Sequence, residues 1–243
     1  NEPEASEAPR LGLVALFAVS PIGVIAAVAS GLLNGAFYSL GNVFGQGVGF
    51  SERCIASFMA ATILGGAVFQ WPVGHLSDRH DRRVVLFWVC ACCAAIAGTG
   101  FYLAREFETS LIFLGIFYGG FSFAIYGLAV AHVNDLIDPS RVLEVTGGLL
   151  LLYGIGATAG PTLAGAVMDW LGPESLMLYF ASVLALLGAC VWRYTIKYPL
   201  GANITDHKAD YVLMGSGTQA VLQMDPRRDP NDAVYSHSQQ HSE

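Results

Sequence analysis

The feature that most constrains this sequence is a series of six long stretches without Asp, Glu, Lys or Arg. They are residues 11–51, 54–77, 84–104, 109–134, 145–168 and 175–192. About 20 apolar residues are enough for a helix to cross the roughly 30 Å hydrocarbon core of a bilayer. Backbone polar groups find no water there, so a spanning segment must be a helix or part of a closed barrel. Barrel strands alternate apolar and polar residues, which these stretches do not, so the sequence predicts transmembrane helices.

The composition agrees with a membrane protein. Hydrophobic residues make up 54% of the chain and charged residues only 13%, whereas a soluble domain has about 25% charged residues. The net charge of −7 gives no support for a nucleic-acid partner. The five cysteines all lie in apolar stretches and form no Cys/His cluster with zinc spacing, so we expect no metal and no cofactor.

The expected spans are residues 21–45, 54–73, 84–104, 110–134, 144–168 and 175–193. The first stretch is long enough for two spans, and the distribution of basic residues favours one. With six spans, one membrane face carries Arg10, Arg79, Arg82, Arg83, Arg141, Arg193 and Lys197. The other face carries only Arg53 and Arg105. Cytoplasmic loops are enriched in Lys and Arg, so we expect an all-α, six-transmembrane-helix bundle with both termini cytoplasmic.

Three parts of the chain are expected. Residues 1–20 form a cytoplasmic linker and juxtamembrane lead-in, residues 21–197 the six-helix domain, and residues 198–243 a polar cytoplasmic tail with the composition of a disordered segment. The polar, acidic start lacks the basic region of a signal peptide, which suggests a chain that begins inside a longer protein. Within the spans, glycines four residues apart, such as Gly31/Gly35 and Gly156/Gly160, allow close helix packing.

The connection between the second and third spans is dense in charge. Residues 74–83 read GHLSDRHDRR. Asp78 can accept hydrogen bonds from a helix N-terminus, where the helix dipole favours an anion. Its basic neighbours are Arg79, Arg82 and Arg83, and the carboxylates expected on the same membrane face are Asp135, Asp138 and Glu144. We hypothesise that these charges form a latch, chiefly with Asp135 and Glu144, that shuts the cytoplasmic side in one conformation. Uncoupled, solvated loop charges are the alternative.

This connection resembles a known signature. The pattern Gly74-x-Leu-Ser-Asp78-Arg79-x-x-Arg82-Arg83 is similar to the gating loop of the major facilitator superfamily, which recurs between the second and third helices of each six-helix half. The resemblance extends over residues 11–197 and implies the carboxyl-terminal half of a transporter. Residues 20–23 and 34–38 are similar to bacterial YcaD-like permeases. The superfamily pattern usually has Gly in place of Asp81, so the turn is expected to differ there.

Polar side chains at mid-span depth are candidates for a substrate path, because they are costly in lipid unless they are paired or functional. They are Asn34, Tyr38 and Asn42 on the first span, Gln70 on the second, and Tyr118, Ser122 and Tyr126 on the fourth. For the aromatic residues, simple helix packing is the alternative. No acidic residue lies at the midplane of any expected span. A coupling proton would therefore need a carboxylate in a partner half.

The resemblance implies secondary active transport of a small solute by alternating access in the bacterial inner membrane. The expected partners are the amino-terminal half of the same transporter, the solute, a possible coupling proton and the lipid bilayer. Two other classes remain open, a six-helix intramembrane enzyme and a non-transporting scaffold or sensor. Residues 119–123, GGFSF, do not form a Gly-x-Ser-Gly nucleophile motif, and no two Asp residues occupy membrane depth. We therefore expect that the protein is not an enzyme.

Overall fold

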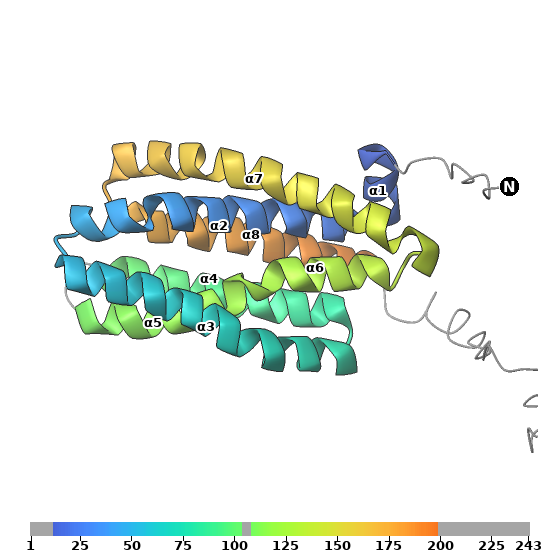
Figure 1. Cartoon of the computed structure of the whole chain (residues 1–243), viewed down its shortest axis with the longest axis horizontal. Helices are drawn as coiled ribbons and strands as arrows, with labels where there is room; N and C mark the ends of the chain where they lie inside the picture. Colours follow the sequence, from blue (N-terminus) through green and yellow to red (C-terminus); the bar gives the residue numbers. More distant parts are fainter. Residues whose placement is uncertain (1–11, 104–107, 199–243) are drawn as a thin grey trace, which may run out of the picture. The chain divides into compact units, whose positions relative to one another are not determined.

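The computed structural model describes residues 12–103 and 108–198, and these residues form helices and no strands (Figure 1). The elements are α1 (Leu13–Val19), α2 (Pro21–Gly47), α3 (Glu52–Arg79), α4 (Arg82–Leu103), α5 (Glu108–Ser122), α6 (Ala124–Asn134), the 3₁₀ helix η1 (Pro139–Arg141), α7 (Val142–Leu171) and α8 (Ser175–Lys197). Six of the segments are long and apolar enough to cross a membrane. The predicted six-helix membrane fold is confirmed. The predicted tail lies outside the described residues, except for Tyr198.

The helices begin and end where the sequence supplies suitable residues. The hydroxyl of Ser20 accepts a hydrogen bond from the Gly23 amide at 3.1 Å and so caps α2, which opens with Pro21. Ser51 caps α3 in the same way. At the far end of α3, residues 74–79 continue the helix although the sequence suggested a loop. The α3–α4 connection therefore consists of His80 and Asp81 alone.

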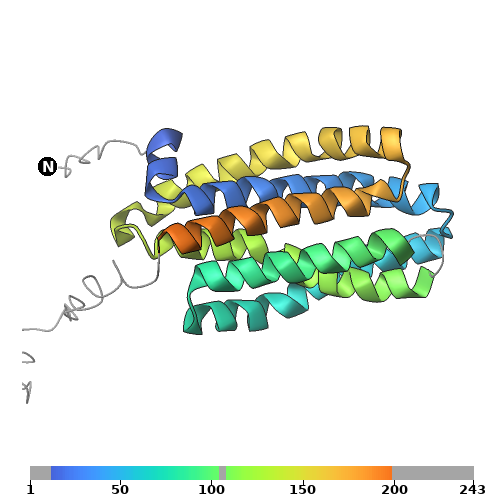
Figure 2. The same ribbon diagram turned by 180° about the vertical axis from the view of Figure 1, so that it is seen from behind.

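Three pairs of helices make the most extensive contacts: α2 with α7, α3 with α5, and α4 with α8 (Figures 1 and 2). The first three spans are α2, α3 and α4, and they correspond in order to the last three, which are α5 with α6, α7 and α8. In this correspondence the α2–α7 pair matches the pair of α5 with α3, and the α4–α8 pair matches itself. The bundle therefore has the contact pattern of two three-helix repeats of opposite orientation, an arrangement that recurs in transporters.

Glycines allow two of these pairs to touch backbone to backbone. A Cβ on Gly31 would collide with the Tyr153 carbonyl oxygen, and one on Gly156 would collide with the Val28 carbonyl oxygen. The same relation holds for Gly35 with Ala157, Gly160 with Leu32, Gly65 with Ile116, and Gly119 with Thr62. Small residues are the usual means of close helix contact in lipid. The glycine pairs that the sequence suggested thus lie in the α2–α7 crossing.

The fourth span runs over residues 110–134, as the sequence suggested, with one irregular residue at Phe123. The α5 helix ends at Ser122 and α6 begins at Ala124. The ring of Phe123 lies 5.8 Å from that of Tyr38, nearly parallel to it, and 6.0 Å from that of Phe37. It also covers Gly66, where a Cβ would collide with it. The backbone of Phe123 keeps helical dihedral angles and its amide donates to the Gly119 carbonyl at 3.0 Å, so the helix continues across this residue while its ring packs against α2 and α3.

The α2–α7 crossing generates a stability prediction. Gly156→Ala is expected to lower the free energy of unfolding by about 1–3 kcal/mol, because the new methyl group must push the two backbones apart. Gly98 on α4 has nothing within 4 Å of an added Cβ, so Gly98→Ala is the matched control and should be neutral or slightly stabilising. Thermal unfolding of both variants in one detergent measures the difference. Equal melting temperatures would contradict the close crossing.

Candidate functional site

Arg82 joins three segments at one end of the bundle. It opens α4, and its Nε atom donates to Asp135 Oδ2 at 2.5 Å, just after α6. Its Nη1 atom lies 3.1 Å from Asp78 Oδ1 and donates to Ser77 Oγ at 3.1 Å, both near the end of α3. The side chain of Arg82 is only 20% exposed. Charge-assisted bonds of this kind are stronger than neutral ones, so Arg82 ties α3, α4 and the end of α6 together.

Asp81 and Arg83 form a second, more buried pair beside it. Oδ1 of Asp81 accepts a hydrogen bond from the Arg83 amide at 2.7 Å, which caps the N-terminus of α4. The Asp81 and Arg83 side chains are 3.0 Å apart and only 11% and 13% exposed. Arg83 Nη1 also donates to the Tyr198 carbonyl at 3.1 Å, just after α8. The residue that replaces the usual Gly of the superfamily pattern thus serves as the helix cap.

The Asp81–Arg83 pair changes the acidity of the carboxyl group. Burial by itself raises the pKa of Asp81, but the hydrogen bonds from the Arg83 side chain and backbone, together with its positive charge, outweigh burial. The pKa of Asp81 therefore lies below its ordinary value, and the carboxylate is the form that the fold stabilises.

The remaining charged residues of the predicted latch have different positions. Asp78 pairs with Arg82 instead of capping a helix. Glu144 lies with its carboxylate 3.6 Å from Nε of Arg141, one turn away. Asp138 accepts hydrogen bonds from the backbone and hydroxyl of Ser140. Arg79 is exposed, and nothing lies within 4 Å of a Cβ added at Gly74. Asp135 is therefore the partner of Arg82, and Glu144 lies beside Arg141.

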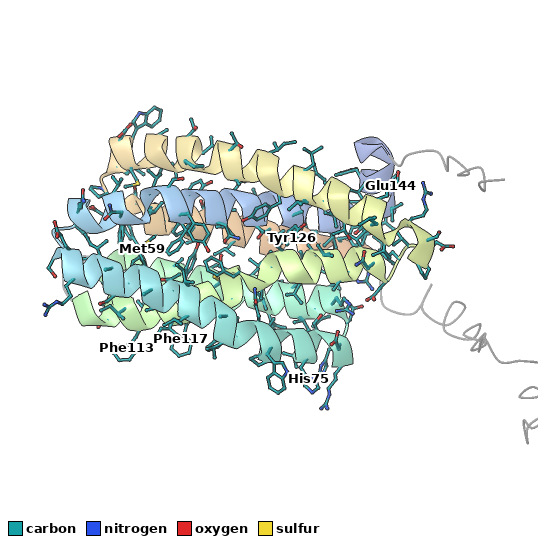
Figure 3. All side chains as sticks on the ribbon, in the orientation of Figure 1. Met59, His75, Phe113, Phe117, Tyr126 and Glu144 are labelled. Atoms are coloured by element: carbon teal, nitrogen blue, oxygen red, sulfur yellow. The ribbon has the colours of Figure 1, made fainter. Side chains whose placement is uncertain are left out.

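A polar patch lies at mid-span where α2, α6 and α7 meet. Asn34 is 93% buried, since its exposed fraction is 7%, and its Nδ2 atom donates to the Tyr153 hydroxyl at 3.4 Å. The Tyr153 ring lies 5.1 Å from that of Tyr126 on α6, which Figure 3 labels between α2 and α6. Tyr38 is 55% exposed and stacks on Phe123, the residue between α5 and α6. Hydroxyl, amide and aromatic groups of three helices thus converge here.

Tyr153 is the member of this patch that the sequence analysis missed. It stands in the run LLLLYGIG of the fifth span. A single hydroxyl group in this otherwise aliphatic run could have identified Tyr153 as a candidate. Two of the candidates on the fourth span lie elsewhere. Tyr118 and Ser122 are buried in the bundle core, where the Tyr118 ring stacks on Phe180 at 5.0 Å. Asn42 and Gln70 are exposed on α2 and α3.

One long face of α7 is open. Its residues are small, apolar or weakly polar, and they line a shallow surface groove: Gly147, Leu150, Leu151, Gly154, Ile155, Thr158, Ala159, Thr162 and Leu163. Nothing lies within 4 Å of a Cβ added at Gly147 or Gly154, whereas Gly156 and Gly160 on the other side of the helix touch α2. Among the described residues, α7 thus has one glycine face that is packed and one that is not.

Six apolar helices, a charged turn at one end and a polar patch at mid-span define a multi-pass membrane protein. The chain belongs to the Major Facilitator Superfamily, whose family model matches residues 11–228. The superfamily points to a transporter rather than an enzyme.

Several bacterial proteins are similar to this chain. An uncharacterized MFS-type transporter of Enterobacter sp. (strain 638) is 30% identical over 73% of the chain and 45% of its own length. One from Yersinia enterocolitica is 28% identical over 67% of the chain and 41% of its own length. The MFS-type transporter YcaD of Escherichia coli is 27% identical over the same shares. The chain spans less than half the length of these curated relatives. No solved structure matches it.

The lowered pKa of Asp81 generates a pH prediction. The folded-state pKa lies below the unfolded value of about 3.9. The carboxylate therefore contributes stability that is complete above about pH 4 and is lost as the pH falls through the folded-state pKa. Thermal unfolding should show Asp81→Asn less stable than the wild type at about pH 7, and the gap should shrink as the pH falls below about 4. A gap that stays constant over this range would contradict the ion pair.

Proposed function

We propose that this chain is the carboxyl-terminal half of a secondary active transporter that moves a small solute across the bacterial inner membrane by alternating access. Membership of the superfamily supports transport, and the length of the relatives supports a second half. The observation that carries the proposal is the open face of α7. A transporter made of two such halves binds its solute near the midplane, between the halves.

The open face of α7 has the chemistry of a helix interface. In the most apolar 18-residue stretch of residues 139–171, only 17% of the residues are buried in the bundle. In the corresponding stretch of α2, 67% of the residues are buried. Lipid favours large apolar side chains at such an exposed surface, yet this one carries Gly147, Gly154 and two threonines. Small residues let another helix approach closely. The amino-terminal half is the partner that this face fits.

The polar patch is the proposed contribution of this half to the solute site. Asn34, Tyr126 and Tyr153 supply hydrogen-bonding groups at mid-span, and Tyr38 is exposed beside them. Their cost in a bilayer is offset when the groups bind each other and a polar solute. The ring of Phe123 stacks on Tyr38 and so forms one wall of this patch.

The charge cluster around Arg82 is the proposed latch. It joins the end of α3, the start of α4 and the end of α6 through a single side chain. We assign it to the cytoplasmic side, because most basic residues of the short connections lie at that end. A contact that only one conformation assembles biases the equilibrium toward that conformation. The cluster would thus hold the cytoplasmic side closed in the outward-open state.

The transport proposal is tested with the full-length protein in vesicles and a panel of radiolabelled or fluorescent solutes. Expression should confer uptake or efflux of at least one solute. Asn34→Ala and Tyr153→Phe should lower the initial rate about tenfold, because each removes one side of the hydrogen bond at mid-span. The melting temperature and the amount of protein in the membrane serve as controls for folding. If both variants transport at the wild-type rate, the solute does not bind at this patch. If no solute of the panel is transported, the result contradicts the transport proposal.

The partner half generates its own prediction. When the two halves are expressed as separate chains, Gly154→Leu should reduce their co-purification severalfold, because leucine fills the groove that the partner helix needs. Ala189→Leu on the exposed side of α8 is the matched control and should leave co-purification unchanged. The assay is the ratio of the two chains after affinity capture of one. Equal ratios in the two variants would contradict the assignment of this face.

The latch is tested by a double-mutant cycle. Arg82→Gln and Asp135→Asn should each slow transport about tenfold, because a charge-assisted bond is worth roughly 1.5–3 kcal/mol. The double variant should be no slower than Arg82→Gln alone, since Asp135→Asn removes only a bond that Arg82→Gln has already removed. Arg53→Gln combined with Asp135→Asn provides the reference cycle, and its effects should multiply. Multiplicative effects of Arg82→Gln and Asp135→Asn would rule out their coupling.

A further inference from the structure

Two basic residues at the end of α8 differ from the paired arginines at the start of α4. Arg193 and Lys197 are exposed and one helical turn apart, so they share a face of α8. Within residues 12–103 and 108–198, neither forms an ion pair, whereas Arg82 and Arg83 are both paired with aspartates. The ammonium group of Lys197 lies 5.6 Å from the centre of the Tyr198 ring. Between Ser175 and Lys197 the sequence contains no acidic residue.

The helices α4 and α8 lie side by side (Figure 2), and three aromatic side chains, Phe87, Trp88 and Trp192, pack together between them. Trp192 on α8 and Trp88 on α4 are 51% and 61% exposed. The ring of Phe87 lies between them, 5.0 Å from Trp192 and 5.5 Å from Trp88. At 1.5 Å per residue, Trp192 lies about 7.5 Å below Lys197, and Trp88 about 9 Å below the start of α4. The two indoles thus occupy a similar depth.

The surface changes in character along α8. Leu186 is 68% exposed and lies deepest, followed by Ala189, then by Trp192 and Arg193, and finally by Lys197 at the end of the helix. This order matches the change from hydrocarbon to interface to headgroup, because tryptophan concentrates at the membrane interface and basic residues bind phosphates above it. The open face of α7, with its glycines and threonines, shows no such order.

We propose that the face shared by α4 and α8 binds an anionic phospholipid, whose phosphate contacts Arg193 and Lys197 and whose acyl chains lie along Trp88, Trp192 and Leu186. The two cations have no carboxylate partner among the described residues, so they offer their charge to the headgroup. A free phosphate ion would use the cations alone. The aromatic and aliphatic surface beneath them favours the lipid as the source of the phosphate.

The test uses the full-length protein with Trp71→Phe and Trp170→Phe, so that within this chain Trp88 and Trp192 report on the site. Any tryptophans outside this chain are replaced by Phe in the same background. The protein is reconstituted in phosphatidylcholine vesicles that contain brominated phosphatidylglycerol or brominated phosphatidylcholine at equal mole fraction. Bromine atoms quench neighbouring tryptophans, so quenching measures occupancy. Two basic residues at a membrane surface should favour the anionic lipid by about 25-fold, at about 1 kcal/mol for each.

Variants separate the site from general surface charge. Arg193→Gln and Lys197→Gln should each lower the preference for phosphatidylglycerol about fivefold, at about 1 kcal/mol per basic residue. Arg53→Gln removes one positive charge at the opposite end of the bundle and should leave the preference unchanged. Soluble glycerol phosphate should not compete. Equal quenching by the two brominated lipids, a preference that survives both single substitutions, or effective competition by glycerol phosphate would each overturn the proposal.

Discussion

The contact on which the rest of the structure depends is the backbone crossing of α2 and α7. Lipid gives little hydrophobic drive for helices to associate, so close packing has to hold them together. Gly31 and Gly156 allow each helix to rest on a carbonyl group of the other. Asn34 lies on α2 between the two contact glycines, Gly31 and Gly35. On α7, the carbonyl of Tyr153 covers Gly31 and its hydroxyl accepts the hydrogen bond from Asn34. The polar patch therefore exists because the two backbones touch. Packing and candidate site are one feature.

The basic residues of one membrane face divide into two groups that the sequence alone does not distinguish. Arg82 and Arg83 stand at the start of a helix, where aspartates before and across from them occupy their guanidinium groups. Arg193 and Lys197 stand at the end of a helix, where cations suit the dipole and no carboxylate is within reach in the described part of the chain. The first pair is turned toward other helices of the bundle and the second toward its surroundings. A count of positive charges predicts orientation, but the neighbours of each charge decide its role.

Much of the fold followed from the sequence because lipid imposes simple rules on it. Six uncharged stretches had to be helices, and glycines four residues apart had to lie at close crossings such as that of Gly31 with α7. The details that escaped prediction depend on three-dimensional neighbours. The capping role of Asp81 requires that α3 continue to Arg79, and spacing does not reveal that. Tyr118 packs on Phe180 of α8 and Tyr126 on Tyr153 of α7, and the spacing within the fourth span does not reveal these different neighbours.

The exposed surfaces of the bundle are best understood by asking what each would cost in lipid. The face of α4 and α8 costs little, since its indoles and leucine suit an interface and its cations reach the headgroups. The face of α7 exposes glycine backbone and threonine hydroxyls. Lipid chains pack against these groups less closely than another helix would. The patch around Asn34 has the highest free-energy cost in a bilayer when no polar solute binds to it, because Tyr38 and its neighbours bring polar atoms to mid-span. The three surfaces thus suit three different environments, which are those proposed above: lipid, a second half and a solute.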